Sequence, residues 1–181
     1  MGDIVVLDEL TINKIAAGEV IERPASVVKE MVENSIDAGA TNINIEIKNG
    51  GIAYIRITDN GNGIAKDDLE IAFERHATSK IRSADDLVKV KSMGFRGEAL
   101  ASIAAVSRVE MISKTKDNST GNRIVVEGGK VLESEEAAAQ NGTVITVENL
   151  FYNTPVRYKF LKRDYSESRC YRGCGYEVST G

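Results

Sequence analysis

The chain has 181 residues, of which 42% are hydrophobic and 28% charged, enough for one domain with a buried core and the beginning of a second. This composition excludes a disordered chain. No apolar run approaches the ~20 residues of a membrane-spanning helix, and Asp3 stands where a secretory signal carries basic residues. We therefore expect a cytoplasmic protein that does not act at a membrane.

Charge and cysteine usage narrow the class further. The formal net charge is -4 and the pI is near 5.2, which argues against a protein that coats nucleic acid, because such a surface is normally basic. The modest basic run at 157–163 is expected to be solvated surface, so we expect weak or absent DNA binding by this chain. Both cysteines follow residue 169, too late to cross-link the main body, which indicates a reducing compartment.

Two helices are predicted at the start of the chain. Residues 11–23 favour a short helix, and a longer one is expected to begin after Pro24, with Ser26 as its N-cap and Gly39 as its stop. Apolar residues recur in the longer helix at helical spacing and are expected to form its buried stripe. They are Val27, Val28, Met31, Val32 and Ile36.

A hairpin follows these helices. Isoleucines alternate with polar residues over 43–47 and the alternation returns over 52–58, on either side of an Asn-Gly-Gly turn. This pattern predicts two antiparallel strands, the second of which ends at Asp59. A glycine-rich loop covers 59–64, and the apolar spacing over 67–73 predicts another helix.

The rest of the chain predicts one more helix and several strands. Between 76 and 93 periodicity is lost over a longer stretch than most connections, which indicates a functional loop, and we expect a lid. Residues 94–97 then open a helix. Strands are predicted near 109–113, 124–127, 131–132 and 144–147. Because hairpin strands pair antiparallel and amphipathic helices need a sheet face to cover, we predict an α+β fold: a mixed, mostly antiparallel sheet covered on one face by helices.

Three polar residues of the longer helix lie on one stripe. Glu30, Asn34 and Asp37 are spaced i, i+4 and i+7, which places them within about 60° of arc. Taken alone, such a stripe is best interpreted as solvated surface. If it lines a pocket instead, the carboxylate of Glu30 could deprotonate water and the amide oxygen of Asn34 could ligate Mg²⁺.

The loop at 59–64 has both a structural and a functional interpretation. Asn, Asp and Gly commonly form turns. A calcium loop fails at Gly61 and Gly63, a dinucleotide fingerprint fails at Lys66, and the chain has no P-loop motif. The remaining functional interpretation is an acceptor carboxylate, Asp59, beside glycines that permit close approach of a flat ligand.

Two further motifs are weak alone. Residues 94–97 offer backbone N–H groups at a helix start, which suit an anion, and they also resemble the loop of KH domains. His76, the only histidine, lacks the companions that a zinc site requires, and Cys170 with Cys174 supply only two ligands. We therefore expect no transition-metal site.

Taken together, these segments resemble the MutL family of DNA mismatch repair proteins, within the GHKL ATPases, the group that also holds DNA gyrase, a heat-shock chaperone and histidine kinases. The shared motifs are residues 27–40 (VVKEMVENSIDAGA), 59–64 (DNGNGI), 75–81 (RHATSKI) with 94–100 (GFRGEAL), and 142–143 (GT). Two further segments are specific to the repair branch, 15–21 (IAAGEVI) and 149–157 (NLFYNTPVR). The resemblance covers residues 3–165.

The resemblance implies a Bergerat fold and an ATP site. Glu30 would be the general base for water that attacks the γ-phosphate, and Asn34 would hold Mg²⁺. Asp59 would accept a hydrogen bond from the adenine amino group, helped through water by Thr143. Other ATP contacts, including the lid and phosphate cradle, would be Ala38, Gly63, Ile64, Thr78, Ser79, Lys80, Gly94, Phe95, Arg96, Gly97, Glu98, Ala99 and Leu100.

The resemblance also implies a role. Family members are weak ATPases in which ATP brings two N-terminal regions together, timing a clamp that works with mismatch recognition and other repair proteins. Residues 1–165 are expected to be the ATPase domain, with residues 1–20 as an arm in the self-association contact. The stretch 166–181 does not resemble the family's continuation and is expected to be a disordered tail of a truncated chain. The alternative function is a nucleotide-binding fragment without significant hydrolysis, because the family's second domain supplies a lysine to the γ-phosphate.

Overall fold

The computed structural model describes residues 5–8, 11–12, 15, 17, 21–77, 97–161 and 178–180. Its helices are α2 (Pro24–Asp37), α3 (Lys66–Leu69), α4 (Ala99–Ala105) and α5 (Pro155–Phe160), with the 3-10 turns η1 (Asn49–Gly51) and η2 (Ile71–Phe73). Its strands are β1 (Ile43–Lys48), β2 (Tyr54–Asp59), β3 (Arg108–Lys114), β4 (Gly121–Glu127), β5 (Lys130–Ala137), β6 (Gly142–Glu148) and β7 (Val178–Thr180). Within these ranges no helix has the length and apolarity needed to cross a bilayer.

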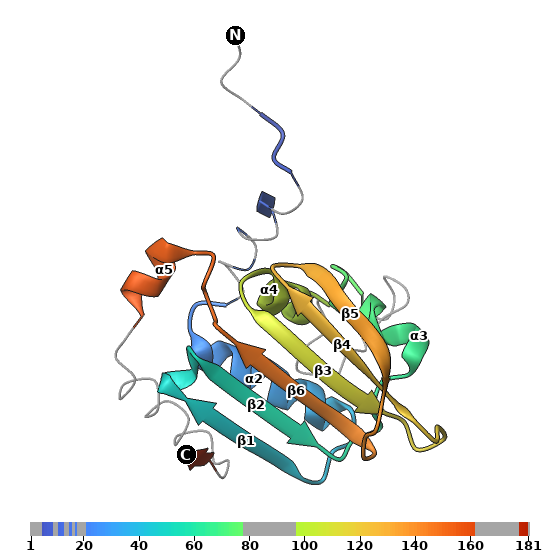
Figure 1. Cartoon of the computed structure of the whole chain (residues 1–181). Helices are drawn as coiled ribbons and strands as arrows, with labels where there is room; N and C mark the ends of the chain where they lie inside the picture. The colour runs from blue at the N-terminus through green and yellow to red at the C-terminus, as the bar shows by residue number, and fades with distance from the viewer. Residues whose placement is uncertain are drawn as a thin grey trace, which may run out of the picture.

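The strands form one sheet in the order β5-β4-β3-β6-β2-β1-β7 (Figure 1). All neighbours pair antiparallel except β1 and β7, which are parallel. The predicted α+β fold with a mixed, mostly antiparallel sheet is therefore confirmed. β6 enters the sheet between β2 and β3, so strands distant in sequence end side by side at the sheet's centre.

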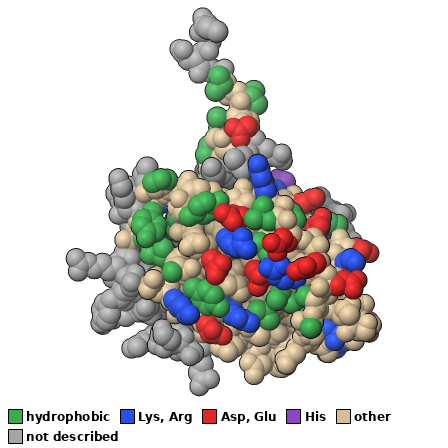
Figure 2. Space-filling view, in the orientation of Figure 1, with side chains coloured by type: hydrophobic (Ala, Val, Ile, Leu, Met, Phe, Trp, Pro, Cys, Tyr) green, Lys and Arg blue, Asp and Glu red, His purple; other side chains and the backbone are tan. Residues whose placement is uncertain are grey.

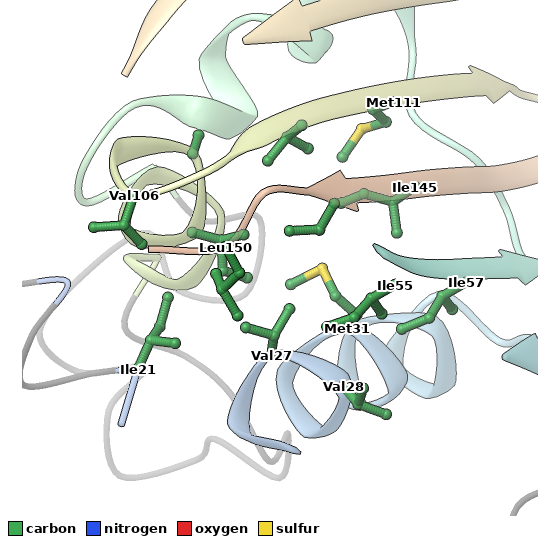
Figure 3. Close-up of a cluster of buried hydrophobic side chains, with 14 of the residues drawn as sticks. Ile21, Val27, Val28, Met31, Ile55, Ile57, Val106, Met111, Ile145 and Leu150 are labelled. Atoms are coloured by element: carbon green, nitrogen blue, oxygen red, sulfur yellow. The ribbon is translucent and has the colours of Figure 1, made fainter. Parts of the chain in front are cut away.

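The hydrophobic core lies between the sheet and helices α2 and α4. Figure 3 shows α2 side chains facing strand side chains such as those of Ile55, Ile57 and Ile145. These isoleucines are at most 5% exposed. The alternation in the sequence predicted this face, because successive strand side chains point to opposite sides of a sheet.

Both ends of helix α2 are determined by the backbone and not by side-chain capping bonds. Pro24 is its first residue and Arg23 its N-cap, without a side-chain capping bond. The prediction of Ser26 as N-cap is wrong, because proline suits the first helical position, where its missing N–H has no partner to lose. The predicted stop at Gly39 is confirmed: Gly39, at φ +74°, donates its N–H to Ile36, and the next N–H reaches Ser35. This is the Schellman pattern.

One buried position of α2 also differs from the prediction. Ile36 is 47% exposed, whereas Ser35 is 4% exposed. The turn of the helix aims position 35, not 36, at the end of the sheet. Ser35 is therefore buried at a position from which its hydroxyl reaches the Asp59 carboxylate.

The opposite sheet face carries no helix among the residues that the structure describes. Charged side chains of both signs alternate across it (Figure 2). Arg123 donates to Glu110, Glu133 and Glu135 at 2.6–2.9 Å. These bonds, first to Glu133 and then to Glu110, raise the pKa of the guanidinium. Cross-strand pairs of opposite charge therefore tie β3, β4 and β5 together on the solvent side.

Two other predictions were only partly right. The helix expected over 67–73 is a single turn, α3, followed by η2. Of the first helix, predicted over 11–23, the described residues 11, 12, 15 and 17 are helical, whereas 21–23 are not. Residues 178–180, the described part of the stretch 166–181, form β7, because the edge of β1 offers unpaired N–H and C=O groups to an extended segment.

Candidate functional site

Three adjacent strands place polar residues at one end of the apolar sheet face. In the register, Ile57 of β2 lies opposite Ile145 of β6. Two residues along the strands, Asp59 lies opposite Thr143, and Thr143 opposite Ser113 of β3. A spacing of two keeps a side chain on the same face. The core therefore ends in a polar row, Asp59, Thr143 and Ser113, on the helix-covered side.

The Asp59 carboxylate is held by three donors. Its Oδ1 accepts the backbone N–H of Gly61 at 2.9 Å and of Thr143 at 3.2 Å. Its Oδ2 accepts the hydroxyl of Ser35 at 2.9 Å. A carboxylate has about four lone-pair sites. The contacts within the described residues thus leave Oδ2 with one acceptor position, fixed in direction by the other three bonds.

Glycines allow the backbone segments beside Asp59 to pack closely. A Cβ on Gly142, at φ +113°, would lie 2.1 Å from the Asp59 carbonyl oxygen. A Cβ on Gly63, at φ +71°, would lie 2.2 Å from the carbonyl oxygen of Lys114. Both positions require glycine for conformation and for room. Gly142 therefore lets the start of β6 pack against the backbone at the end of β2, and Gly63 lets the loop after β2 pack against the backbone at the end of β3.

The loop itself is fastened to the end of α2. The side-chain oxygen of Asn60 accepts the N–H groups of Thr41 and Asn42, each at 2.9 Å. The N–H of Asn62 donates to the Ala38 carbonyl at 2.9 Å. The predicted site residue Ala38 consequently lies against the predicted loop, where a Cβ on Gly61 would come within 3.0 Å of it.

Helix α2 carries Glu30 and Asn34 as well as Ser35. Glu30 has a side chain 28% exposed, and Asn34 is half-buried. Lys29 lies 3.3 Å from Glu33 and 4.0 Å from Glu30, so its ammonium group is nearer to Glu33. The half-burial of Glu30 and Asn34 contrasts with exposed Asp37. The stripe is thus not uniformly solvated, and its first two members lie on the helix that also touches Asp59.

Any metal bound in this site would be held by oxygen donors. The ranges that the structure describes hold no group of three or more His, Cys, Asp or Glu side chains placed to bind a metal. The donor type of Asn34, an amide oxygen, suits Mg²⁺, which takes few protein ligands and completes its shell with phosphate oxygens and water. The residues present therefore fit a metal that arrives with a nucleotide.

Part of the predicted phosphate-binding segment is described. Gly97, Glu98, Ala99 and Leu100 are half-buried at the start of α4. The Glu98 carboxylate lies 3.3 Å from Nδ1 of His76. A Cβ on Gly97 would lie 2.4 Å from the Ala77 carbonyl oxygen. The two flanks of segment 78–96 are thus in contact. Other predicted site residues lie outside the described residues: Thr78, Ser79, Lys80, Gly94, Phe95 and Arg96.

Sequence reasoning missed two hydroxyls of the site. Ser35 holds Asp59, and Ser113, which is 0% exposed, bonds Thr143, Gly142 and the N–H of Ile64. A signal for both existed. Each serine occupies a position at which the apolar periodicity of its helix or strand requires a buried side chain, and a buried hydroxyl needs a partner.

The chain is similar to known proteins over most of its length. Residues 21–150 match the family model described as histidine kinase-, DNA gyrase B-, and HSP90-like ATPase. The chain is 62% identical over 167 residues to the DNA mismatch repair protein MutL of Agathobacter rectalis, covering 92% of this chain and 26% of that protein. The MutL of Caldanaerobacter subterraneus is 59% identical, with 93% and 28% covered. The chain thus spans about a quarter of the length of these relatives.

Solved structures show the same fold. The ATPase domain of Aquifex aeolicus MutL complexed with ADP has a TM-score of 0.70 and 36% identity, covering 86% of this chain and 54% of that one. The same domain with a K252N mutation has a TM-score of 0.65 at 36% identity, covering 83% and 49%.

Proposed function

The chain belongs to the histidine kinase-, DNA gyrase B-, and HSP90-like ATPase family, and we propose that it binds ATP with Mg²⁺ and hydrolyses it slowly as the switch of a DNA mismatch repair protein. One observation carries the proposal: the Asp59 carboxylate is held by three donors and keeps one acceptor position on Oδ2. An acceptor of fixed direction suits a base with an exocyclic amine. The similarity to MutL proteins supplies the repair context.

Base recognition would use the polar row at the sheet's end. Asp59 Oδ2 accepts one N–H of the adenine amino group, and Thr143, whose backbone N–H already bonds Asp59, presents its hydroxyl next to it. Gly63 and Ile64 border the base. Ala38, against the loop, closes the same side. A 6-oxo purine places an oxygen against the carboxylate, so adenine is favoured over guanine.

Hydrolysis would use the half-buried stripe of α2 that carries Glu30 and Asn34. ATP supplies the γ-phosphate, and bound Mg²⁺ would neutralise charge on its oxygens. The Glu30 carboxylate takes a proton from the water that attacks the γ-phosphorus, while the bond from that phosphorus to the bridging oxygen of ADP breaks. Asn34, one helical turn further, would hold the cation through its amide oxygen. The protein's contribution is positional and electrostatic, which suits phosphoryl transfer.

The switch would act through self-association of the N-terminal arm. Apolar side chains there are strongly exposed, including Val5 at 74%, Val6 at 100% and Ile15 at 52%. An exposed apolar segment favours burial against a partner surface, and a second copy with ATP bound is the partner that the similarity to MutL favours. Mismatch recognition and other repair proteins would read this state. We place the activity in the cytoplasm, where bacterial DNA repair takes place.

A second candidate is nucleotide binding without turnover. The chain covers only 54% of the solved MutL ATPase domain with ADP, so groups for the γ-phosphate can come from outside it. Phosphate release from ATP, measured at increasing chain concentration, separates the candidates. A rate per chain that rises with concentration supports the self-associating switch. ATP binding with no release above a Glu30→Ala control supports the second candidate, and no binding refutes both.

A further inference from the structure

The Ser113 hydroxyl has more neighbours than it has protons. It is fully buried and accepts the N–H of Ile64 at 2.8 Å. It lies 3.1 Å from the carbonyl oxygen of Gly142, to which it donates, and 2.9 Å from the Thr143 hydroxyl, where either oxygen can be the donor. A hydroxyl has one proton and two acceptor lone pairs. These three contacts therefore use all of its capacity in one arrangement only.

In that arrangement Ser113 dictates the direction of the Thr143 proton. The Ile64 N–H takes one lone pair of Ser113, and the Gly142 carbonyl takes the proton. Thr143 must then donate to the second lone pair of Ser113. Its own lone pairs consequently point away from Ser113. The reverse arrangement, in which Ser113 donates to Thr143, leaves two oxygens 3.1 Å apart without a proton between them.

We infer that Ser113 is a positioning residue for base recognition: it fixes the Thr143 hydroxyl as an acceptor beside the Asp59 carboxylate. The inference rests on the proposed ATP site. A water at Thr143 then donates one proton to Thr143 and directs the other to the ring nitrogen N1 of adenine. Asp59 Oδ2 meets the neighbouring amino group. Together these groups match the donor and acceptor that lie side by side on one edge of adenine.

Ser113 also links two backbone segments that border the proposed base site. Its bond to Ile64 fixes the loop after β2, and its bond to Gly142 fixes the start of β6. Gly142 lets the start of β6 pack against Asp59, and Gly63 lets the loop pack against Lys114, the residue after Ser113. One buried hydroxyl therefore connects the wall of the site, Ile64, to its hydrogen-bonding floor, Thr143.

The test compares affinities for ATP and 1-deaza-ATP, which lacks N1 but keeps the amino group. We expect the wild-type chain to prefer ATP, and we expect Ser113→Ala to reduce that preference about fivefold, the value of one hydrogen bond. On a Thr143→Val background, Ser113→Ala should change the preference no further. Ser107→Ala is the matched control, because Ser107 is equally buried and, within the part of the chain that the structure describes, its hydroxyl bonds only the α4 carbonyl of Ile103, at 2.6 Å. It should leave the preference unchanged.

The results that would contradict the role of Ser113 differ from those that would contradict the proposed ATP site. Equal weakening of both ligands by Ser113→Ala, with the preference intact, shows a merely structural hydroxyl and overturns the inference. If Ser113→Ala does not fold, Ser113→Cys takes its place, because a thiol of similar shape donates only weakly and should lower the preference in the same direction. A wild-type chain that binds neither ligand refutes the proposed function itself, whereas binding of both with no preference refutes only the role of Ser113.

Discussion

Replacing Asp59 by asparagine tests base recognition with little change of shape. The amide oxygen of Asn can still accept the N–H groups of Gly61 and Thr143. The amide nitrogen takes the place of Oδ2, and the Ser35 hydroxyl can accept from it while donating to the Met31 carbonyl 3.1 Å away. The fold should therefore survive. The position that faces the ligand, however, changes from acceptor to donor.

The magnitude follows from the bond that is lost. A hydrogen bond to a charged group contributes about 1.5–3 kcal/mol, so the ATP dissociation constant should rise roughly 10- to 150-fold. The reversed polarity should at the same time favour a 6-oxo purine. We expect inosine triphosphate to bind Asp59→Asn more tightly than ATP does. Isothermal titration calorimetry with both nucleotides measures this reversal of preference, and a thermal melt verifies that the variant folds. Unchanged ATP affinity in a folded variant would refute the assignment of Asp59.

Three further substitutions test other parts of the account. Glu30→Ala should keep ATP affinity within about twofold and abolish phosphate release, because it removes only the base for water; equal loss of binding would contradict that role. Gly142→Ala should lower the free energy of unfolding by ~2–6 kcal/mol, because φ is +113° and a Cβ would lie 2.1 Å from the Asp59 carbonyl. A lower urea midpoint measures this loss. Arg157→Gln should lower the free energy of unfolding by about 1–2 kcal/mol, because it removes the 2.6 Å hydrogen bond to the Ile21 carbonyl. Faster hydrogen exchange of the Ile21, Glu22 and Arg23 amides measures this effect, and unchanged exchange would show that the bond does not hold this segment.

The sheet and the main helix could be predicted because their signals are local. Alternation over β1 and β2, and a stop glycine after α2, depend only on neighbours in sequence. The order β3-β6-β2, by contrast, comes from pairing between strands far apart in the chain. No local pattern announces that Thr143 will lie next to Asp59; only the family resemblance predicted it.

The two missed hydroxyls show the limit of periodicity. A serine at a buried position of a helix or strand looks like an imperfection in the apolar pattern, as Ser35 does beside Ile36. The role of Ser35 can be identified only when its hydrogen-bond partner is known, and that partner is the Asp59 carboxylate at 2.9 Å. The error at Ser26 has a similar origin, since a good capping residue followed Pro24, which already begins the helix.

The most direct test of the central claim is equilibrium binding of ATP to the unmodified chain, with Mg²⁺ and with a chelator. We predict saturable binding with one ATP per chain, strengthened by Mg²⁺, because Asp59 is already held for the base and the cation adds a link between the phosphates and α2. Absence of binding by a chain that melts cooperatively would contradict the claim that these residues form an ATP site.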